Sequence, residues 1–280
     1  MNTFNSGLYI VSTPIGNLDD ITLRSLEVLK KSDIILCEDT RRSIKLLNHY
    51  KIKKKLLSYH KFNEQKELQK IIEYLNEGKI LSLISDAGTP TLSDPGLLLV
   101  KTCIENNIEV HPIPGPSAIT AAVSASGFDD KFLFYGFLPK SENDLIKIMK
   151  NLKDLNFSLV FFIPGIKINF YLEFFKNYFL GRNILIAREI SKLHETFYRE
   201  KISEIKPFKT TLKGELTIVI SKIYTNNKLT TDLEVINQAK KYLEKYSLKD
   251  VVELISKKEK ISKKKVYDIC LKIKNDKKNN

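Results

Sequence analysis

Four loops rich in small and polar residues follow apolar segments in the first half of the chain. They comprise Ser12–Leu18, Glu38–Arg42, Ser85–Pro90 and Pro112–Ala118. In an open α/β sheet, ligands bind in the crevice outside the carboxyl ends of the strands, where such loops meet. The sequence therefore predicts that these four loops form a single ligand-binding site.

Residues in the first and third loops have two interpretations each, and the fourth loop indicates a type of ligand. Pro14 and Gly16 indicate either close approach of the backbone to a ligand or an ordinary turn. Asp86 either caps its own turn or binds a ribose or an amino group. The segment from Pro114 to Pro116 is rigid and poor in N–H donors, so its carbonyls suit a cation or an amine better than a phosphate.

The second loop places Glu38 and Asp39 beside Arg41 and Arg42. One interpretation is a surface cluster of ion pairs, which would contribute little to stability. The other places the two acids near a reacting group and the two arginines on phosphates, because the planar guanidinium binds phosphate oxygens in pairs.

Several common sites are absent from the sequence. There is no G-x-G-x-x-G dinucleotide motif, no G-x-x-x-x-G-K-[ST] phosphate loop and no H-E-x-x-H metal motif. The four histidines are scattered, so we expect no metal centre.

Composition and charge narrow the class of protein. The 280 residues are 42% hydrophobic and 28% charged, which is typical of globular proteins. The formal charge of +13 indicates either a polyanionic partner such as nucleic acid or a lysine-rich solubilising surface. Three widely spaced cysteines without a C-x-x-C pair fit a reducing cytoplasm. Without a long apolar run or a signal-like start, we expect a soluble cytoplasmic protein with no membrane partner.

The elements that position the loops follow a βαβα order in the first part of the chain. Strands are predicted at 8–11, 33–37, 56–59, 80–84 and 108–110, and one helix is predicted at 64–76. Two further helices are expected to begin at Asp19–Asp20 and at Ser93–Pro95, the second ending near Asn106. This order predicts a mostly parallel sheet with flanking helices.

A second unit begins near Lys131. Strands are predicted at 132–135, 157–163, 183–187, 195–200 and 215–221, with helices at 142–152 and 167–179. Short connections between several of these strands indicate a mixed sheet. We expect three domains: an α/β domain at 1–127, a second α/β domain at 128–224 and a helical appendage at 225–280.

The appendage is rich in lysine. After a linker at 225–228, helices are predicted at 232–245, 248–257 and 262–272. Residues 256–280 contain ten lysines and three acids, a net charge of 10 − 3 = +7. Both an RNA-contacting appendage and a solvated helical cap are consistent with this pattern.

The loop sequences resemble successive motifs of the ribosomal small subunit methyltransferase I family. The matching segments are STPIGNLDDIT at 12–22, CEDTR at 37–41, SDAGTP at 85–90, SDPG at 93–96 and PGPSA at 114–118. The resemblance continues through GFLP at 136–139, Ala187–Glu189 with Lys192 and Glu195, and KGE at 213–215. One segment departs from the family, because FIPGIK at 162–167 stands where relatives have a sequence like Tyr-Glu-Ser-Pro-His-Arg.

The resemblance implies a fold and an activity. The family has a tetrapyrrole methylase fold, in which two α/β domains bind S-adenosylmethionine (SAM) between them, and is usually homodimeric. The implied reaction is 2'-O-methylation of a cytidine in the decoding region of 16S rRNA in the small ribosomal subunit, at cytidine-1402.

Site residues follow from the matching positions. Glu38 and Asp39 are the candidate proton acceptors, since the attacking 2'-hydroxyl must lose its proton. RNA contacts are expected from Arg41, Arg42 and Arg188. Cofactor contacts are expected from Pro14, Gly16, Asp86, Ala87, Gly88, Thr89, Pro114, Gly115, Ser117, Ala118, Gly214 and Glu215.

Two alternatives to this activity stay open. One is a methyltransferase of the same fold acting on a tetrapyrrole or another small molecule. The other is an RNA-binding ribosome assembly factor without catalytic activity, suggested by the divergent segment at 162–167.

Overall fold

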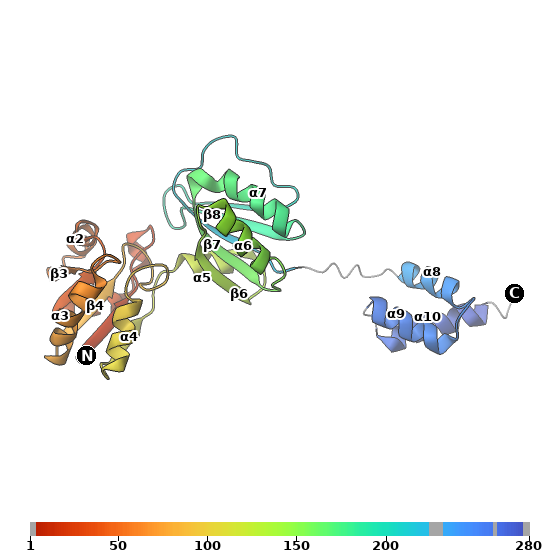
Figure 1. The fold of residues 1–280 in the computed structure, drawn as a ribbon, viewed down its shortest axis with the longest axis horizontal. Coiled ribbons are helices and arrows are strands. Elements are labelled where there is room, and N and C mark those ends of the chain that lie inside the picture. The colour runs from red at the N-terminus through yellow and green to blue at the C-terminus, as the bar shows by residue number, and fades with distance from the viewer. Residues whose placement is uncertain (1–3, 224–231, 260–261, 277–280) are drawn as a thin grey trace. The chain divides into compact units, whose positions relative to one another are not determined.

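The computed structural model describes residues 4–223, 232–259 and 262–276, and the chain divides into two compact units between residues 223 and 224. The predicted linker at 225–228 lies outside the described residues. The first unit contains two sheets, and the second unit is helical (Figure 1). The α/β fold class with a helical C-terminal part is thus confirmed, whereas the division at residue 127 stays a prediction.

The first sheet has five strands in the order β3-β2-β4-β1-β5. Every neighbouring pair runs parallel. All carboxyl ends of these strands therefore lie at one edge of the sheet, as the mostly parallel architecture predicts. The strands are β1 (Gly7–Val11), β2 (Ile34–Cys37), β3 (Lys55–Ser58), β4 (Ile80–Ile84) and β5 (Val110–Ile113).

Helices cover both faces of this sheet, which is why its central strands are buried on both sides. On one face, Leu8 and Leu36 pack with α3 (Glu64–Asn76) and α4 (Leu97–Glu105). On the other face, Tyr9 and Ile35 pack with α1 (Leu23–Lys31) and α2 (Thr40–His49). Neighbouring residues of one strand thus belong to different core clusters, as the alternation of side chains along a strand requires.

The second sheet is mixed, in the order β6-β7-β10-β8-β9. The pair β6–β7 is parallel and the other pairs are antiparallel. Helices α6 and α7 share the core of one face, and α5 packs with Val160, Leu185 and Val219 on the other. The elements are α5 (Ala118–Ser126), β6 (Phe132–Phe137), α6 (Glu142–Leu152), β7 (Ser158–Pro164), α7 (Ile168–Phe179), β8 (Asn183–Arg188), β9 (Thr196–Lys201) and β10 (Glu215–Ile220).

The second unit has a core of its own. Helices α8 (Asp232–Tyr242), α9 (Leu248–Glu259) and α10 (Lys263–Asp276) occupy the three predicted regions, with ends that differ by a few residues. Their buried residues form one apolar cluster that includes Val235, Ala239, Val251, Ile255 and Val266. The lysines of α9 and α10 surround this cluster as a solvated exterior.

Two predicted helix starts are wrong. Asp19 and Asp20 lie in a short 3-10 turn, and α1 begins later, capped by the Thr22 hydroxyl, which accepts from the Ser25 N–H. Helix α4 begins at Leu97 rather than at Ser93, because Ser93 has a left-handed φ of 70° that no helix continues from.

Three other elements differ from expectation. Strand β5 begins at Val110 rather than at residue 108, and it includes Pro112. Proline is tolerated there because β5 lies at the edge of the sheet. Helices α2 and α5 have no predicted counterpart, and α2 begins at Thr40, inside the segment predicted as the second loop. Within the described part of the chain, no helix combines the length and apolarity that a membrane span requires.

Candidate functional site

The first and third loops are joined at the carboxyl-end edge of the parallel sheet. Thr13 and Gly88 form an isolated antiparallel bridge, with N–H···O distances of 2.9 and 3.0 Å. The Thr13 hydroxyl also donates to the Ser85 carbonyl at 3.2 Å. Gly88 has a φ of 81°, a conformation that favours glycine and lets its backbone lie against the first loop.

The fourth loop contacts the other two at a point of close approach. The Thr89 hydroxyl donates to the Pro116 carbonyl at 3.4 Å, and the Ser12 and Thr89 hydroxyl oxygens lie 2.9 Å apart. A Cβ atom on Gly115 would lie only 2.8 Å from the Ser12 Cβ. Gly115 is therefore required by packing. Ser117 occupies the N-cap position of α5, but its side chain makes no capping hydrogen bond, and Ala118 is the first residue of the helix.

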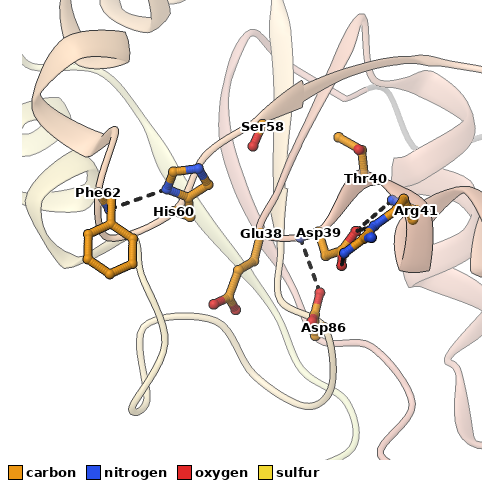
Figure 2. A pocket seen from close by; sticks show the side chains of 8 residues that line it. All are labelled: Glu38, Asp39, Thr40, Arg41, Ser58, His60, Phe62 and Asp86. Atoms are coloured by element: carbon orange, nitrogen blue, oxygen red, sulfur yellow. Dashed lines mark hydrogen bonds and ion pairs between the residues drawn. The ribbon is translucent and has the colours of Figure 1, made fainter.

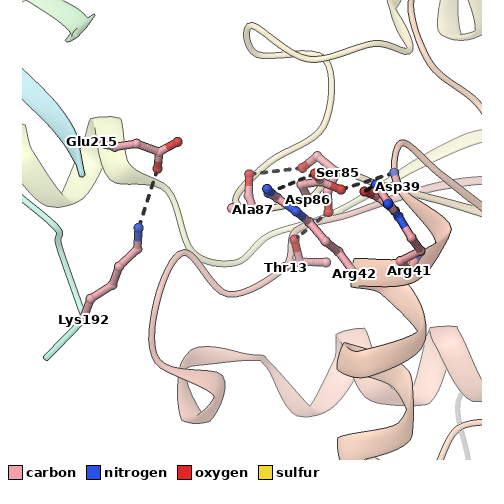
Figure 3. Close-up of polar contacts among 9 residues, drawn as sticks. All are labelled: Thr13, Asp39, Arg41, Arg42, Ser85, Asp86, Ala87, Lys192 and Glu215. Carbon is pink, nitrogen blue, oxygen red and sulfur yellow. Dashed lines mark hydrogen bonds and ion pairs between the residues drawn. The ribbon is translucent and has the colours of Figure 1, made fainter. Parts of the chain in front are cut away.

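The second loop joins the same group through Asp86. The Asp86 carboxylate accepts from the Asp39 N–H at 3.3 Å and pairs with Arg42 at 3.1 Å (Figure 3). The Asp86 side chain thus contacts the second loop, so its role is not limited to capping its own turn. All four sequence-predicted loops therefore meet at one edge of the sheet.

A cavity of ≈ 430 Å³ opens beside the second and third loops. Figure 2 shows Glu38 between the His60–Phe62 turn and the Asp39–Asp86 contact. The volume lies in the range of about 300–1,000 Å³ that small-molecule sites occupy. Its lining residues are Glu38, Asp39, Thr40, Arg41, Ser58, His60, Phe62 and Asp86.

Asp39 is tied to Arg41 and to the start of α2. Its carboxylate accepts from the Arg41 backbone N–H at 2.8 Å and pairs with the Arg41 guanidinium at 2.8 Å. These hydrogen bonds lower the pKa of Asp39 to about 2. The ion-pair cluster predicted within the second loop is confirmed for Asp39 and Arg41, whereas Arg42 pairs with Asp86 of the third loop. The Arg41 side chain is 87% exposed and the Arg42 side chain is 69% exposed, so both pairs contribute little to folding.

In contrast to Asp39, the carboxyl groups of Glu38 and Asp94 have raised pKa values. Burial and the nearby charge of Asp86 raise the pKa of Glu38. Burial and the charge of Glu38 raise the pKa of Asp94 to about 6. Asp94 is not among the sequence-predicted site residues, because the segment Ser93–Pro95 looks like a helix start. In the structure it extends the acidic group formed by Glu38 and Asp86.

Gly16 lies on the other side of the first loop, against a turn of the second sheet. A Cβ atom on Gly16 would lie 2.9 Å from the Ile190 carbonyl oxygen. The Ser191 hydroxyl accepts from the Asn17 N–H at 2.7 Å and donates to Asp20 at 2.7 Å. Close packing thus joins the first loop to residues 190–191.

The turn at residues 189–192 also contacts Gly214 and Glu215. Lys192 pairs with Glu189 at 3.0 Å and with Glu215 at 3.7 Å (Figure 3). Gly214 has a φ of 95° and faces the Glu189 side chain. The Arg188 guanidinium donates to the Lys213 carbonyl at 3.0 Å. Arg188 therefore lies in the second sheet beside the Gly214 segment, apart from the exposed pair Arg41 and Arg42.

The divergent segment at 162–167 forms the end of β7 and a 3-10 turn. The Gly165 N–H donates to the Gly214 carbonyl at 2.8 Å. A Cβ atom on Gly165 would lie 2.6 Å from the Leu212 carbonyl oxygen. This segment thus supports the Gly214 loop through its backbone.

Within the residues that the structure describes, no group of three or more His, Cys, Asp or Glu side chains is arranged to hold a metal ion.

Comparison of the sequence with known families and proteins gives consistent results. Residues 7–206 match the model of the tetrapyrrole (corrin/porphyrin) methylases. The ribosomal RNA small subunit methyltransferase I of Thermotoga maritima is 48% identical over 217 residues, which cover 76% of this chain and 97% of that protein. The protein of the same name from Rickettsia prowazekii is 42% identical over 275 residues, covering 94% of this chain and 96% of the relative.

Solved structures share the fold at lower sequence identity. The methyltransferase CobJ superposes with a TM-score of 0.58 at 18% identity, covering 78% of this chain and 94% of CobJ. A uroporphyrin-III C-methyl transferase from Thermus thermophilus, complexed with S-adenyl homocysteine, superposes with a TM-score of 0.54 at 13% identity. The match covers 78% of this chain and 98% of that protein. These likenesses confirm the fold of the first unit.

Proposed function

Because the chain belongs to the ribosomal RNA small subunit methyltransferase I family, within the tetrapyrrole methylases, we propose that it methylates ribosomal RNA with SAM as methyl donor. The proposed acceptor is the 2'-hydroxyl of a cytidine in the decoding region of 16S rRNA, cytidine-1402. The observation that carries the proposal is the meeting of four small-residue loops beside a cavity lined by Glu38. A homodimer and a cytoplasmic location also stay predictions.

The residues at the four loops fit the proposed cofactor. When bound, SAM supplies an electrophilic methyl group on a positively charged sulfur. Carbonyl oxygens such as that of Pro116 attract a positive charge, and the Asp86 carboxylate accepts hydrogen bonds from hydroxyl or amino groups. The absence of a side chain at Gly115 lets the fourth loop pack closely against Ser12, and the φ of 81° at Gly88 lets the third loop bridge to Thr13.

Glu38 is the better of the two candidate proton acceptors. A 2'-hydroxyl must lose its proton when it attacks, and a general base works best when its pKa is near the working pH. Burial and Asp86 raise the pKa of Glu38, whereas Arg41 lowers the pKa of Asp39 to about 2. In this proposal Glu38 accepts the proton, and Asp39 orients Arg41 and the start of α2.

Orientation of the two reactants accounts for most of the expected rate. Well-positioned reactants can gain roughly 7–11 kcal/mol relative to free encounter. The rigid Pro114–Pro116 segment and the Thr13–Gly88 bridge hold the loop backbones in one arrangement. The exposed guanidinium groups of Arg41 and Arg42 are available to bind RNA phosphates at the mouth of the cavity.

The proposal is tested by methyl transfer from labelled SAM. Small ribosomal subunits from a strain lacking the modification are one acceptor, and porphyrinoids are the other. Transfer to the RNA supports the proposal, and transfer to porphyrinoids alone supports the small-molecule alternative. Saturable SAM binding in calorimetry without transfer to either acceptor would contradict the proposed activity and leave an assembly factor.

The proton acceptor is tested by two matched variants. Glu38→Gln is expected to lower kcat by about 10²–10⁴-fold with unchanged affinity for SAM, because it removes general base catalysis. Glu105→Gln makes the same chemical change at the far end of α4 and should leave kcat unchanged. A Glu38→Gln enzyme with wild-type kcat would exclude Glu38 as the proton acceptor.

A further inference from the structure

An exposed aromatic ring borders the polar cavity. Phe62 is 94% exposed although it belongs to the cavity lining with Glu38 and Asp86. A single exposed apolar side chain is common on protein surfaces and needs no explanation by itself. The position of Phe62 is different, because its ring belongs to the same lining as Glu38 and Asp86 and lies across Glu38 from Asp39 and Asp86 (Figure 2).

The backbone around Phe62 is held by its neighbours. The Asn63 amide oxygen accepts from the His60 N–H at 2.7 Å, and its amide nitrogen donates to the Ser58 carbonyl at 2.9 Å. The Phe62 N–H donates to His60 Nδ1 at 3.3 Å. The turn therefore holds the Phe62 backbone in place and leaves the ring exposed, which reduces the ordering entropy that a ligand must overcome.

The chemistry of this opening selects among ligands. A wholly apolar ligand would have to remove the carboxylates of Glu38 and Asp39 from water without offering them hydrogen bonds, which is costly. A nucleobase combines a flat ring that stacks on an aromatic side chain with polar edges that bind donors and acceptors. We infer that Phe62 stacks against the unpaired base of the nucleotide whose ribose is methylated, and that His60 lies beside it as the polar end of the same turn.

The inference rests on the proposed function, which places the 2'-hydroxyl at Glu38. The base of a nucleotide is attached to the sugar carbon next to the one that carries this hydroxyl. A ribose at Glu38 therefore has its base within the same cavity, whose ≈ 430 Å³ is in the range of small-ligand sites.

His60 contributes a defined donor in its neutral form. Because His60 Nδ1 accepts from the Phe62 N–H, the ring proton lies on Nε2. That N–H is suited to an acceptor on the edge of a pyrimidine, such as a ring nitrogen or a carbonyl oxygen.

The test measures kcat and KM for small ribosomal subunits with four full-length variants. Phe62→Ala and Phe62→Leu both remove the flat ring, and Leu keeps apolar bulk. Both are expected to raise KM about 5- to 150-fold, the range for loss of one base–aromatic stack. Phe62→Trp keeps a stacking face and should stay within about threefold of the wild type. Ile104→Ala removes an exposed apolar side chain near the end of α4, away from the loops, and should change nothing.

Three further readouts separate the outcomes. Affinity for SAM and the melting temperature should be the same in all variants, because Phe62 makes little contact with the core. Filter binding of the small subunits measures the stacking contribution independently of methyl transfer. A wild type that binds the subunits without methylating them contradicts the proposed function. An active wild type with unchanged KM and RNA affinity in Phe62→Ala, or a Phe62→Trp variant as impaired as Phe62→Ala, overturns the inference.

Discussion

Replacing Gly115 with alanine is expected to push the fourth loop away from the first. The added Cβ atom would lie 2.8 Å from the Ser12 Cβ, which is closer than packed carbon atoms approach. Overpacking typically costs about 1–3 kcal/mol of the free energy of unfolding, and the lower part of this range is expected because Gly115 is exposed although Ser12 is buried. The same displacement moves the carbonyls of the Pro114–Pro116 segment, so the affinity for SAM should fall as well.

A second substitution isolates the cause. Ser12→Gly removes the atom that the new Cβ would meet, and the next nearest atom, the Ser12 carbonyl oxygen, lies at 3.5 Å, an ordinary contact. Alone, Ser12→Gly should cost about 1–2 kcal/mol, through the lost bond to Thr89 and the added backbone freedom. In the double variant the two substitutions should offset each other by about 1–3 kcal/mol.

The assay is urea unfolding of the wild type, both single variants and the double variant, with calorimetry of SAM on each. Gly181→Ala is the matched control, because a Cβ atom there meets nothing within 4 Å. Strictly additive costs in the double variant would show that Gly115 and Ser12 are not in contact. Wild-type SAM affinity in Gly115→Ala would show that the fourth loop takes no part in the cofactor site.

Three other substitutions test electrostatics and packing. The folded pKa of Asp94, about 6, lies above its usual value near 3.9, so its contribution to stability falls as pH rises from about 4 to about 6. The full shift corresponds to about 3 kcal/mol, and solvent screening reduces it to about 1–2 kcal/mol. Asp94→Asn should therefore weaken the dependence of the urea midpoint on pH between about 4 and 6. A pH dependence equal to that of the wild type would contradict the raised pKa. Gly16→Ala should lower the melting temperature by about 2–4 °C for each kcal/mol of strain, and a melting curve like that of the wild type would exclude the close contact to Ile190. Arg182 donates to four backbone carbonyls, so Arg182→Met should cost at least about 3 kcal/mol in urea unfolding, whereas a loss below 1 kcal/mol would mean that water replaces those bonds.

Continuous apolar runs made the central strands of the first sheet predictable. β2 and β4 are buried on both faces, so their sequences contain few polar residues and their limits agree closely with expectation. The helix starts were harder, because Asp19 and Ser93 are residue types that cap helices but here serve a 3-10 turn and a left-handed bend. Helix α5 was missed because its small residues give a weak amphipathic pattern, and its burial comes from a distant sheet.

The meeting of the four loops was predictable because parallel strands bring their carboxyl ends to one edge. Which side chains pair within the loops was not predictable, since Asp86 contacts Asp39 and Arg42 across more than forty positions of sequence. Phe62 was missed for the same reason, because it lies outside the four loops in sequence and only the packed fold places it beside Glu38. Asp94 belongs to the SDPG motif at 93–96, and it was missed because that segment has the residue types of a helix start.

A crystal structure of the full chain with S-adenosylhomocysteine would test the central claim most directly. The four loops are expected to contact the ligand, with the backbone of Gly88 and Gly115 against it and the Asp86 carboxylate within hydrogen-bond distance of one of its polar groups. Ligand density elsewhere on the molecule, with no contact to these loops, would contradict the claim that they form the methyl-donor site.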